Sequence, residues 1–255
     1  MRFLEFATNP YRGIDIMPDN LPRDPEEFRG RLQASLKLWR KNSFLVVWLQ
    51  IPSGRASLIP IAVELGFSFH HTSHDTLMMF YRLDDAAFVP EFASHYIGAG
   101  GVVINEQNEL LVIVEQLHVE KRPNFFKLPG GTLHPGEHLD DAVCREVWEE
   151  TGIQTEFERV VCFRHLHEYR HSKSDIYFVC QLRPLTHEIS IQDDEIAKAK
   201  WTPVEKYLAS EHISVFNKGV VRLALRPDSG LVSGWIDGYE ADRAVREIYM
   251  PLVLE

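Results

Sequence analysis

Three glutamates close together in the middle of the chain constrain its fold more than any other feature. Glu146, Glu149 and Glu150 stand at positions i, i+3 and i+4 of a short predicted helix. At 3.6 residues per turn, their carboxylates share one face of that helix. Like charges at this spacing destabilise a helix by roughly 0.2–0.5 kcal/mol per pair. Because carboxylate oxygens suit hard divalent cations, this face predicts a site for Mg²⁺ or Mn²⁺.

Glycines flank the acidic helix on both sides. Gly130 and Gly131 precede it, and residues without a Cβ let the backbone approach a metal ion or a phosphate closely. Gly152 follows the acids and suits the left-handed position that ends a helix. The face opposite the glutamates is apolar, so we expect it to pack into the core with Leu139, Ala142, Val143 and Val147.

The composition is that of an ordinary globular protein, with 45% hydrophobic and 25% charged residues in a chain of 255. The three cysteines form no CxxC pair, which favours free thiols in a reducing compartment. Neither a signal sequence nor a membrane-spanning apolar run is evident, so we expect a cytoplasmic protein. A formal net charge of −10 argues against binding to DNA or to an anionic membrane, because both need Lys and Arg.

The pattern of apolar residues divides the chain into two parts. The first, to about Phe92, predicts the order helix, strand, helix, strand, strand, and its first helix is expected over residues 25–41 after a cap at Asp24. From Gly98 onward, strands stand on both sides of the acidic helix, which indicates an α/β sandwich. The end of the chain shows no clear pattern after two further expected helices, over residues 204–210 and 215–225.

The segment from Gly131 to Ile153 resembles the Nudix box at every defining position. The box reads Gly-x5-Glu-x7-Arg-Glu-U-x-Glu-Glu-x-Gly-U, where U is aliphatic, and Glu137 and Arg145 take its first Glu and its Arg. The chain is therefore identified as a member of the Nudix hydrolase superfamily. This resemblance implies an α/β (α+β) fold, a Nudix α/β/α sandwich over residues 95–255 with the box at residues 131–153.

The resemblance extends to the front of the chain. The stretches FRGRLQASLKLWR, VWLQIP and AVELGFSFHHTSHDTLMMFYRL are similar to the pre-Nudix region of one subfamily. They imply a smaller N-terminal α/β pre-Nudix domain over residues 1–94. Plant members of that subfamily act on ADP-ribose, NADH or related dinucleotides. Since many Nudix enzymes of this kind are dimers, a homodimer is expected by the same resemblance.

The family's known chemistry implies roles for individual residues. Glu146, Glu149 and Glu150, with the backbone carbonyl near Gly130, resemble the family's ligands for Mg²⁺ or Mn²⁺. Glu137 and Arg145 resemble the family's internal salt bridge, in which the planar guanidinium also orients the neighbouring glutamates. Such a pyrophosphohydrolase cleaves a nucleoside diphosphate linked to another moiety, using a metal-activated water.

The base that activates the water has several candidates. The segment QDDEIAKAKW resembles the family stretch in which an acid precedes a strand, and Glu195 is the first choice. Asp194 and Asp193 stand behind it, Glu146 is the alternative within the box, and a merely solvated acidic loop is the competing interpretation. The substrate also has alternatives: nucleoside triphosphates, CoA derivatives and capped RNA, or nucleotide sensing without catalysis.

Residues near the box supply candidate substrate contacts. Phe125 or Phe126 is expected to stack on a base, although core packing is the commoner role, and Gly131 is expected to lie against a phosphate. The chain also contains the sequence HExxH, from His167 to His171. Because this motif follows a predicted strand, we do not expect it to form the helix of a zinc protease. Positive or polar side chains for an anionic substrate are expected from Arg164, His165, His167, Arg170 and Lys173.

Overall fold

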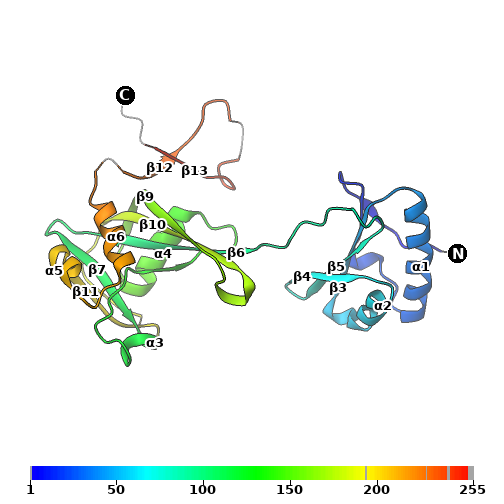
Figure 1. The fold of residues 1–255 in the computed structure, drawn as a ribbon, viewed down its shortest axis with the longest axis horizontal. Coiled ribbons are helices and arrows are strands. Elements are labelled where there is room, and N and C mark those ends of the chain that lie inside the picture. Colours follow the sequence, from blue (N-terminus) through cyan, green and yellow to red (C-terminus); the bar gives the residue numbers. More distant parts are fainter. Residues whose placement is uncertain (1, 193, 228, 240–241, 252–255) are drawn as a thin grey trace. The chain divides into compact units, whose positions relative to one another are not determined.

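The computed structural model describes residues 2–192, 194–227, 229–239 and 242–251, and divides them into two compact units. The first unit ends at Ser94 and the second begins at His95. Figure 1 shows the elements of each unit in chain order. The acidic helix belongs to the second unit, and the candidate site lies there.

The first unit is a five-stranded sheet packed against two helices. Helix α1 (Pro25–Lys41) covers the residues expected to be helical, and the Asp24 carboxylate caps it by accepting a hydrogen bond from Glu27 N at 2.7 Å. Its apolar side packs with the sheet and with α2 (Ile59–Glu64) in one core. The strands, in the order β1-β2-β3-β5-β4, are β1 (Ala7–Thr8), β2 (Gly13–Ile16), β3 (Val46–Pro52), β5 (Thr76–Arg82) and β4 (Ser68–Ser73).

The second unit is built on a six-stranded sheet in the order β13-β12-β9-β10-β6-β8, with a separate pair β11-β7. Strands β6 and β10 run parallel, and the other pairs are antiparallel. The strands are β6 (His95–Val103), β7 (Glu109–Glu115), β8 (Gly130–Thr132), β9 (Thr155–Leu166), β10 (Ser174–Pro184), β11 (Ile196–Pro203), β12 (Leu231–Gly234) and β13 (Ile248–Pro251). The helices are α3 (Gln116–Val119), α4 (Leu139–Thr151), α5 (Val204–Ala209) and α6 (Val215–Ala224).

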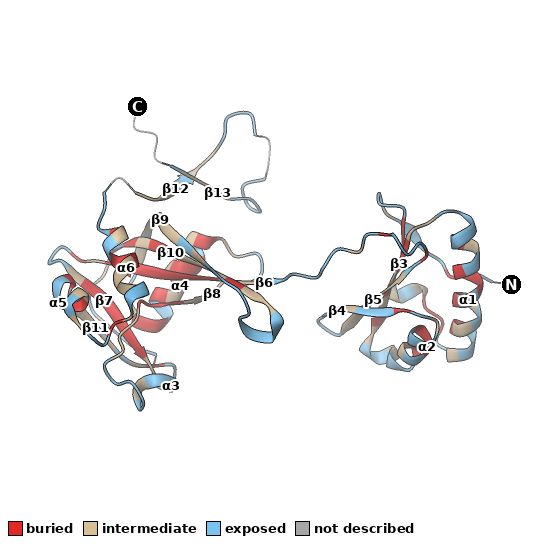
Figure 2. Cartoon of the chain, in the orientation of Figure 1, coloured by how far each residue is buried: buried red, intermediate tan, exposed pale blue. Residues whose placement is uncertain are grey.

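Two cores lie on opposite faces of this sheet. Val103 packs with Val143 and Val147 of α4, whereas its neighbour Val102 packs with Val204 of α5 and Val221 of α6. Adjacent strand residues point to opposite faces, so the sheet lies between α4 and the α5–α6 pair. This is the α/β/α sandwich, and Figure 2 shows its buried residues along β6, β7 and α4.

The end of the chain forms structure that its pattern did not predict. β12 and β13 pair as an antiparallel ribbon, and Leu231 of β12 pairs with Val160 of β9. The ribbon therefore extends the central sheet at its edge. The two helices expected before it are present, as α5 and α6.

Candidate active site

The acidic helix α4 is fixed at both ends. At its start, Leu139 N donates to a carboxylate oxygen of Glu247 at 3.0 Å, which satisfies one of the unpaired donors of the first turn. At its end, Gly152 has φ 72° and donates its N–H to Trp148 O at 2.7 Å. The left-handed backbone here is one that Gly adopts without a steric penalty. The first contact ties the start of α4 to Glu247, and the second closes the end of the helix.

Arg145 donates hydrogen bonds to carboxylates of this face and of the preceding loop. Its Nε and Nη2 donate to the two oxygens of Glu137 at 2.6 and 2.9 Å, which is a bidentate pair. Its Nη1 donates to Glu146 at 3.0 Å and to Glu149 at 2.8 Å. The hydrogen bonds from Arg145 lower the pKa of Glu137 to about 2, against the cost of desolvation. One guanidinium therefore orients three carboxylates and fastens the loop to the helix.

Glu150 lies behind this group, on the buried side. Only 3% of it is exposed, and its carboxylate accepts a hydrogen bond from Gly130 N at 2.7 Å. Burial raises the pKa of Glu150 to about 8, and burial also raises the pKa of Glu146. A Cβ on Gly131 would lie 2.4 Å from the Glu146 carboxylate, so only a glycine leaves room there.

These groups fit a hard divalent cation. In addition to burial, the charge of Glu149 raises the pKa of Glu146, the charge of Glu146 raises the pKa of Glu150, and the charge of Glu195 raises both. Partly buried carboxylates that repel one another gain most from a bound positive charge. The residues that would hold the ion are Glu146, Glu149 and Glu150, and the Gly130 carbonyl is the further ligand that the resemblance implies.

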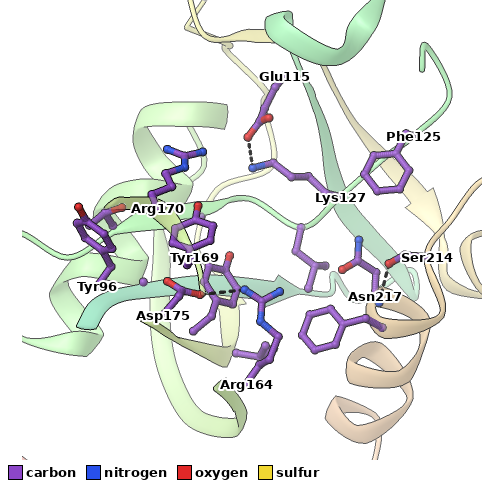
Figure 3. A pocket seen from close by; sticks show the side chains of 18 of the residues that line it. Tyr96, Glu115, Phe125, Lys127, Arg164, Tyr169, Arg170, Asp175, Ser214 and Asn217 are labelled. Carbon is purple, nitrogen blue, oxygen red and sulfur yellow. Dashed lines mark hydrogen bonds and ion pairs between the residues drawn. The ribbon is translucent and has the colours of Figure 1, made fainter. Parts of the chain in front are cut away.

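A cavity of about 870 Å³ opens beside the glycine pair, and Glu146, Glu149 and Glu150 are not among its lining residues. Its wall includes Gly130, Gly131 and Glu195, so the glycine pair and the predicted base face the same space. Lys127 pairs with Glu115 inside it, as Figure 3 shows, and lowers the pKa of Glu150 by its charge. The wall of the cavity therefore carries both Lys and Arg side chains and carboxylates.

Arg164 places a second positively charged side chain on the wall of the cavity. Its Nη2 pairs with Asp175 at 2.9 Å, and only 9% of the Asp175 side chain is exposed. The guanidinium carbon lies 5.5 Å from the ring centroid of Tyr177 and 5.3 Å from that of Phe216. Figure 3 shows this group across the cavity from Lys127. The planar cation is thus held between two rings, with part of its surface left to the cavity.

The structure brings only some of the predicted substrate contacts to the cavity. Phe125, Arg164 and Arg170 line it, together with Gly131. Phe126 is not among the lining residues and packs into the core beside α5 and α6.

The two histidines expected near the cleft lie elsewhere. Strand alternation turns His165 to the face opposite Arg164, and His167 follows the end of β9 and is not a lining residue. Glu168 and His171 have φ of 55° and 52°, so the HExxH stretch is a turn and not the helix of a zinc protease. Asp193 lies outside the described residues.

Several lining residues carried no recognisable sequence signal. Tyr96 and Asp175 pair in register on β6 and β10, and both face the cavity with Tyr177. A Cβ on Gly100 would lie 2.2 Å from the Tyr177 hydroxyl, so the glycines of β6 make space for this ring. Phe216 and Asn217 reach the cavity from the first turn of α6. Alternation along a strand identifies such residues only once the face of the sheet is known.

A second group of potential ligands lies at the start of α4. Among the described residues, His138, Asp140 and Glu247 have ligand atoms within 4.8 Å of one another. Their contacts already have a structural explanation, because Glu247 caps the helix and His138 Nε2 hydrogen-bonds Ala244 O at 3.0 Å. The group fastens the end of the chain to α4.

Comparisons with known proteins bear on both units. A family model described as Nudix hydrolase domain matches residues 4–83, and one described as NUDIX domain matches residues 94–223. The chain is 37% identical to Nudix hydrolase 8 of Arabidopsis thaliana over 207 residues, 80% of this chain and 56% of that protein. It is 40% identical to Nudix hydrolase 2 of the same plant over 190 residues, 73% of this chain and 68% of that protein.

A human relative and one solved structure complete the comparison. The chain is 33% identical to human Nucleoside diphosphate-linked moiety X motif 6 over 230 residues, 88% of this chain and 70% of that protein. The crystal structure of a MutT protein from Methanosarcina mazei Go1 matches 52% of this chain and 94% of its own, at 23% identity and a TM-score of 0.44.

None of the helices in the described part of the chain has the length and apolar character that a membrane span requires.

Proposed function

Because this chain belongs to the Nudix hydrolase family, the pyrophosphohydrolases of nucleoside diphosphates linked to another moiety, we propose that it cleaves ADP-ribose, NADH or a related dinucleotide. One observation carries the proposal. Arg145 holds Glu137, Glu146 and Glu149 together, and Glu150 is bonded to Gly130, which lines a cavity of about 870 Å³. Drug-sized ligands occupy pockets of roughly 300–1,000 Å³, so a dinucleotide fits at the upper end of that range.

The proposed chemistry is the family's metal-dependent hydrolysis. Mg²⁺ or Mn²⁺, held by Glu146, Glu149, Glu150 and the Gly130 carbonyl, would neutralise the charge on the pyrophosphate and lower the pKa of an attacking water. Arg145 keeps Glu146 and Glu149 in place as ligands without reorganisation when the substrate binds.

Glu195 is the proposed base. It is exposed on the cavity wall, and its backbone is fixed because Gln116 N donates to Glu195 O at 2.8 Å. An exposed carboxylate beside the acids can take a proton from water and pass it to solvent. Glu146 and Asp194 are the alternatives for this role; Glu146 is already bonded to Arg145, which leaves Glu195 the better acceptor.

We propose that different walls of the cavity bind the diphosphate and the outer groups of the substrate. Lys127 and Gly131 suit the diphosphate, with Phe125 on the side of Lys127, whereas Arg164 and the neighbouring tyrosines suit planar or anionic groups further out. The aromatic and cationic character of both walls supports a dinucleotide over a single small phosphate ester.

Turnover over a substrate panel tests this proposal. We expect Mg²⁺- or Mn²⁺-dependent hydrolysis that is fastest with ADP-ribose or NADH, compared with nucleoside triphosphates, CoA derivatives and capped RNA. Glu149→Gln and Glu150→Gln should each reduce kcat by about a hundredfold or more, because a metal ligand supplies several kcal/mol of charge stabilisation. Glu158→Gln, on an exposed part of β9, is the matched control. Full activity in both box variants would remove the metal assignment, and tight binding without turnover would indicate a nucleotide sensor.

A further inference from the structure

Two glycines of β6 leave room for the ring of Tyr177 on the cavity side of the sheet. Tyr177 lines the cavity and pairs with Gly98 across the parallel β10–β6 ladder. A Cβ on Gly98 would lie 3.0 Å from the Cδ2 atom of the ring, and a Cβ on Gly100 would lie 2.2 Å from the hydroxyl oxygen. The ring therefore lies along β6 from Gly98 to Gly100, and its hydroxyl ends beside Gly100.

This position brings the hydroxyl close to the glycine pair of the box. Gly100 pairs with Gly130 of β8 in an antiparallel ladder, where partner Cα atoms lie roughly 4.5–5.5 Å apart. Gly130 in turn donates its N–H to the Glu150 carboxylate at 2.7 Å. Gly130, Gly131 and Tyr177 all line the cavity. The hydroxyl thus lies at the part of the cavity where we place the diphosphate.

The hydroxyl is available to a ligand. Among the residues that the structure describes, none forms a hydrogen bond with it. Arg164 contacts Tyr177 through the ring, with its guanidinium carbon 5.5 Å from the ring centroid, so that contact does not use the hydroxyl. Enclosed phenols usually have a hydrogen-bond partner, and here the open side is the cavity.

We propose that the Tyr177 hydroxyl donates a hydrogen bond to a non-bridging phosphate oxygen of the bound diphosphate, as a further catalytic residue. This inference rests on the proposed function. No bond forms at Tyr177 and no proton leaves it: the phenol donates a hydrogen bond while water attacks phosphorus. A donor placed before the substrate binds stabilises the charge of the phosphate without reorganisation.

A neutral donor suits this position because the box and the substrate are both negative. Burial, followed by the charge of Glu150, raises the pKa of Tyr177, so the phenol keeps its proton at neutral pH. Lys127 supplies positive charge to the same cavity from another strand of the wall. The diphosphate would therefore meet a charged donor and a neutral donor in addition to the metal.

Tyr177→Phe tests the contact because it removes the hydroxyl and keeps the ring against Gly98 and Arg164. We expect kcat/KM for the substrate that the wild type cleaves to fall roughly tenfold to a hundredfold, the strength of a hydrogen bond to a charged group. The melting temperature should stay near that of the wild type. Tyr81→Phe, which removes a hydroxyl bonded to Arg40 in the first unit, is the matched control and should keep full turnover. Unchanged kcat/KM in folded Tyr177→Phe would overturn the proposal and leave Tyr177 as a packing partner of Arg164.

NMR of the wild-type protein gives a second test that needs neither turnover nor a folded variant. The tyrosine Cζ atoms are labelled with ¹³C, and the Tyr177 signal is assigned from its backbone resonances. Imidodiphosphate, which resists hydrolysis, is added with Mg²⁺ and should shift the Cζ signal of Tyr177 but not that of Tyr81. An unshifted Tyr177 signal would overturn the proposal. A shift in a protein that cleaves no linked nucleoside diphosphate would instead contradict the proposed function and keep the contact.

Discussion

At the scale of single residues, Arg145 connects the loop to the catalytic face. Its guanidinium has five N–H donors in one plane, and its contacts with Glu137, Glu146 and Glu149 use both ends of that fork. Lys has one ammonium group and could not hold these carboxylates in fixed directions. The order of the site therefore depends on one residue that is not itself a proposed metal ligand.

The Glu137–Arg145 pair predicts a pH-dependent contribution to stability. The pKa of Glu137 falls from 4.5 to about 2 on folding because Arg145 donates to its charged form. A lowered pKa means that the stabilisation is present above pH 4.5 and is lost as the pH falls toward 2. Glu137→Gln should cost about 2 kcal/mol of unfolding free energy at pH 7, the scale of a charged hydrogen bond.

Urea unfolding at several pH values measures this effect. The difference between Glu137→Gln and the wild type should shrink as the solution is acidified through that range. Glu211→Gln, which changes an exposed carboxylate between α5 and α6, should show little difference at any pH. A constant gap for Glu137→Gln would mean that its cost comes from packing and not from charge.

A substitution of Arg164 is expected to weaken substrate binding without slowing the chemical step. Lys at this position would keep the positive charge but lose the planar stack on Tyr177 and Phe216. Arg164→Lys should raise KM for the dinucleotide about tenfold, equivalent to about 1.4 kcal/mol, and change kcat little. Arg183→Lys, whose exposed partner is Glu156, is the matched control in steady-state kinetics. A fall in kcat with KM unchanged would place Arg164 in the chemical step instead.

At the scale of elements, the loop–helix segment was readable from the sequence because its constraints are local. Gly152 and the apolar face of α4 follow from helix periodicity and capping, and both occur as expected. The β12–β13 ribbon and the Glu247 cap were not predicted, because both depend on contacts with residues about 70 to more than 100 positions away. Residue spacing within one segment carries no information about such partners.

Substitutions of the two glycines before α4 are expected to have different effects, one on folding and one on activity. Gly130 has φ 145°, and a Cβ there would lie 2.2 Å from Ala99 O, so Gly130→Ala should disturb folding of the sheet edge. A Cβ on Gly131 meets the end of the flexible Glu146 side chain, which can move. Gly131→Ala should therefore fold but lower kcat by about a hundredfold, the effect of misplacing a reacting group by about 1 Å.

Thermal unfolding and metal-dependent turnover separate these two variants. We expect a lower melting temperature for Gly130→Ala and a near wild-type melting temperature for Gly131→Ala. The reverse pattern would show that Glu146 does not need the space beside Gly131.

At the scale of the whole molecule, the sequence predicted the reaction class better than the substrate. The box residues are fixed types at fixed spacing, whereas Tyr96, Asp175 and Phe216 come from three separate elements. Their meeting is a property of the tertiary fold, so the wall that would select the substrate was not visible in the sequence. The net charge of −10 makes the local cations Lys127 and Arg164 more important for an anionic ligand.

Product analysis with ADP-ribose tests the central claim most directly. Wild-type protein with Mg²⁺ or Mn²⁺ should yield AMP and ribose 5-phosphate in equal amounts, because water breaks a P–O bond of the anhydride bridge between the two phosphates. Removal of the metal with a chelator should abolish both products. Failure to release a pair of monophosphates from ADP-ribose, from NADH or from any other linked nucleoside diphosphate would contradict the proposed activity.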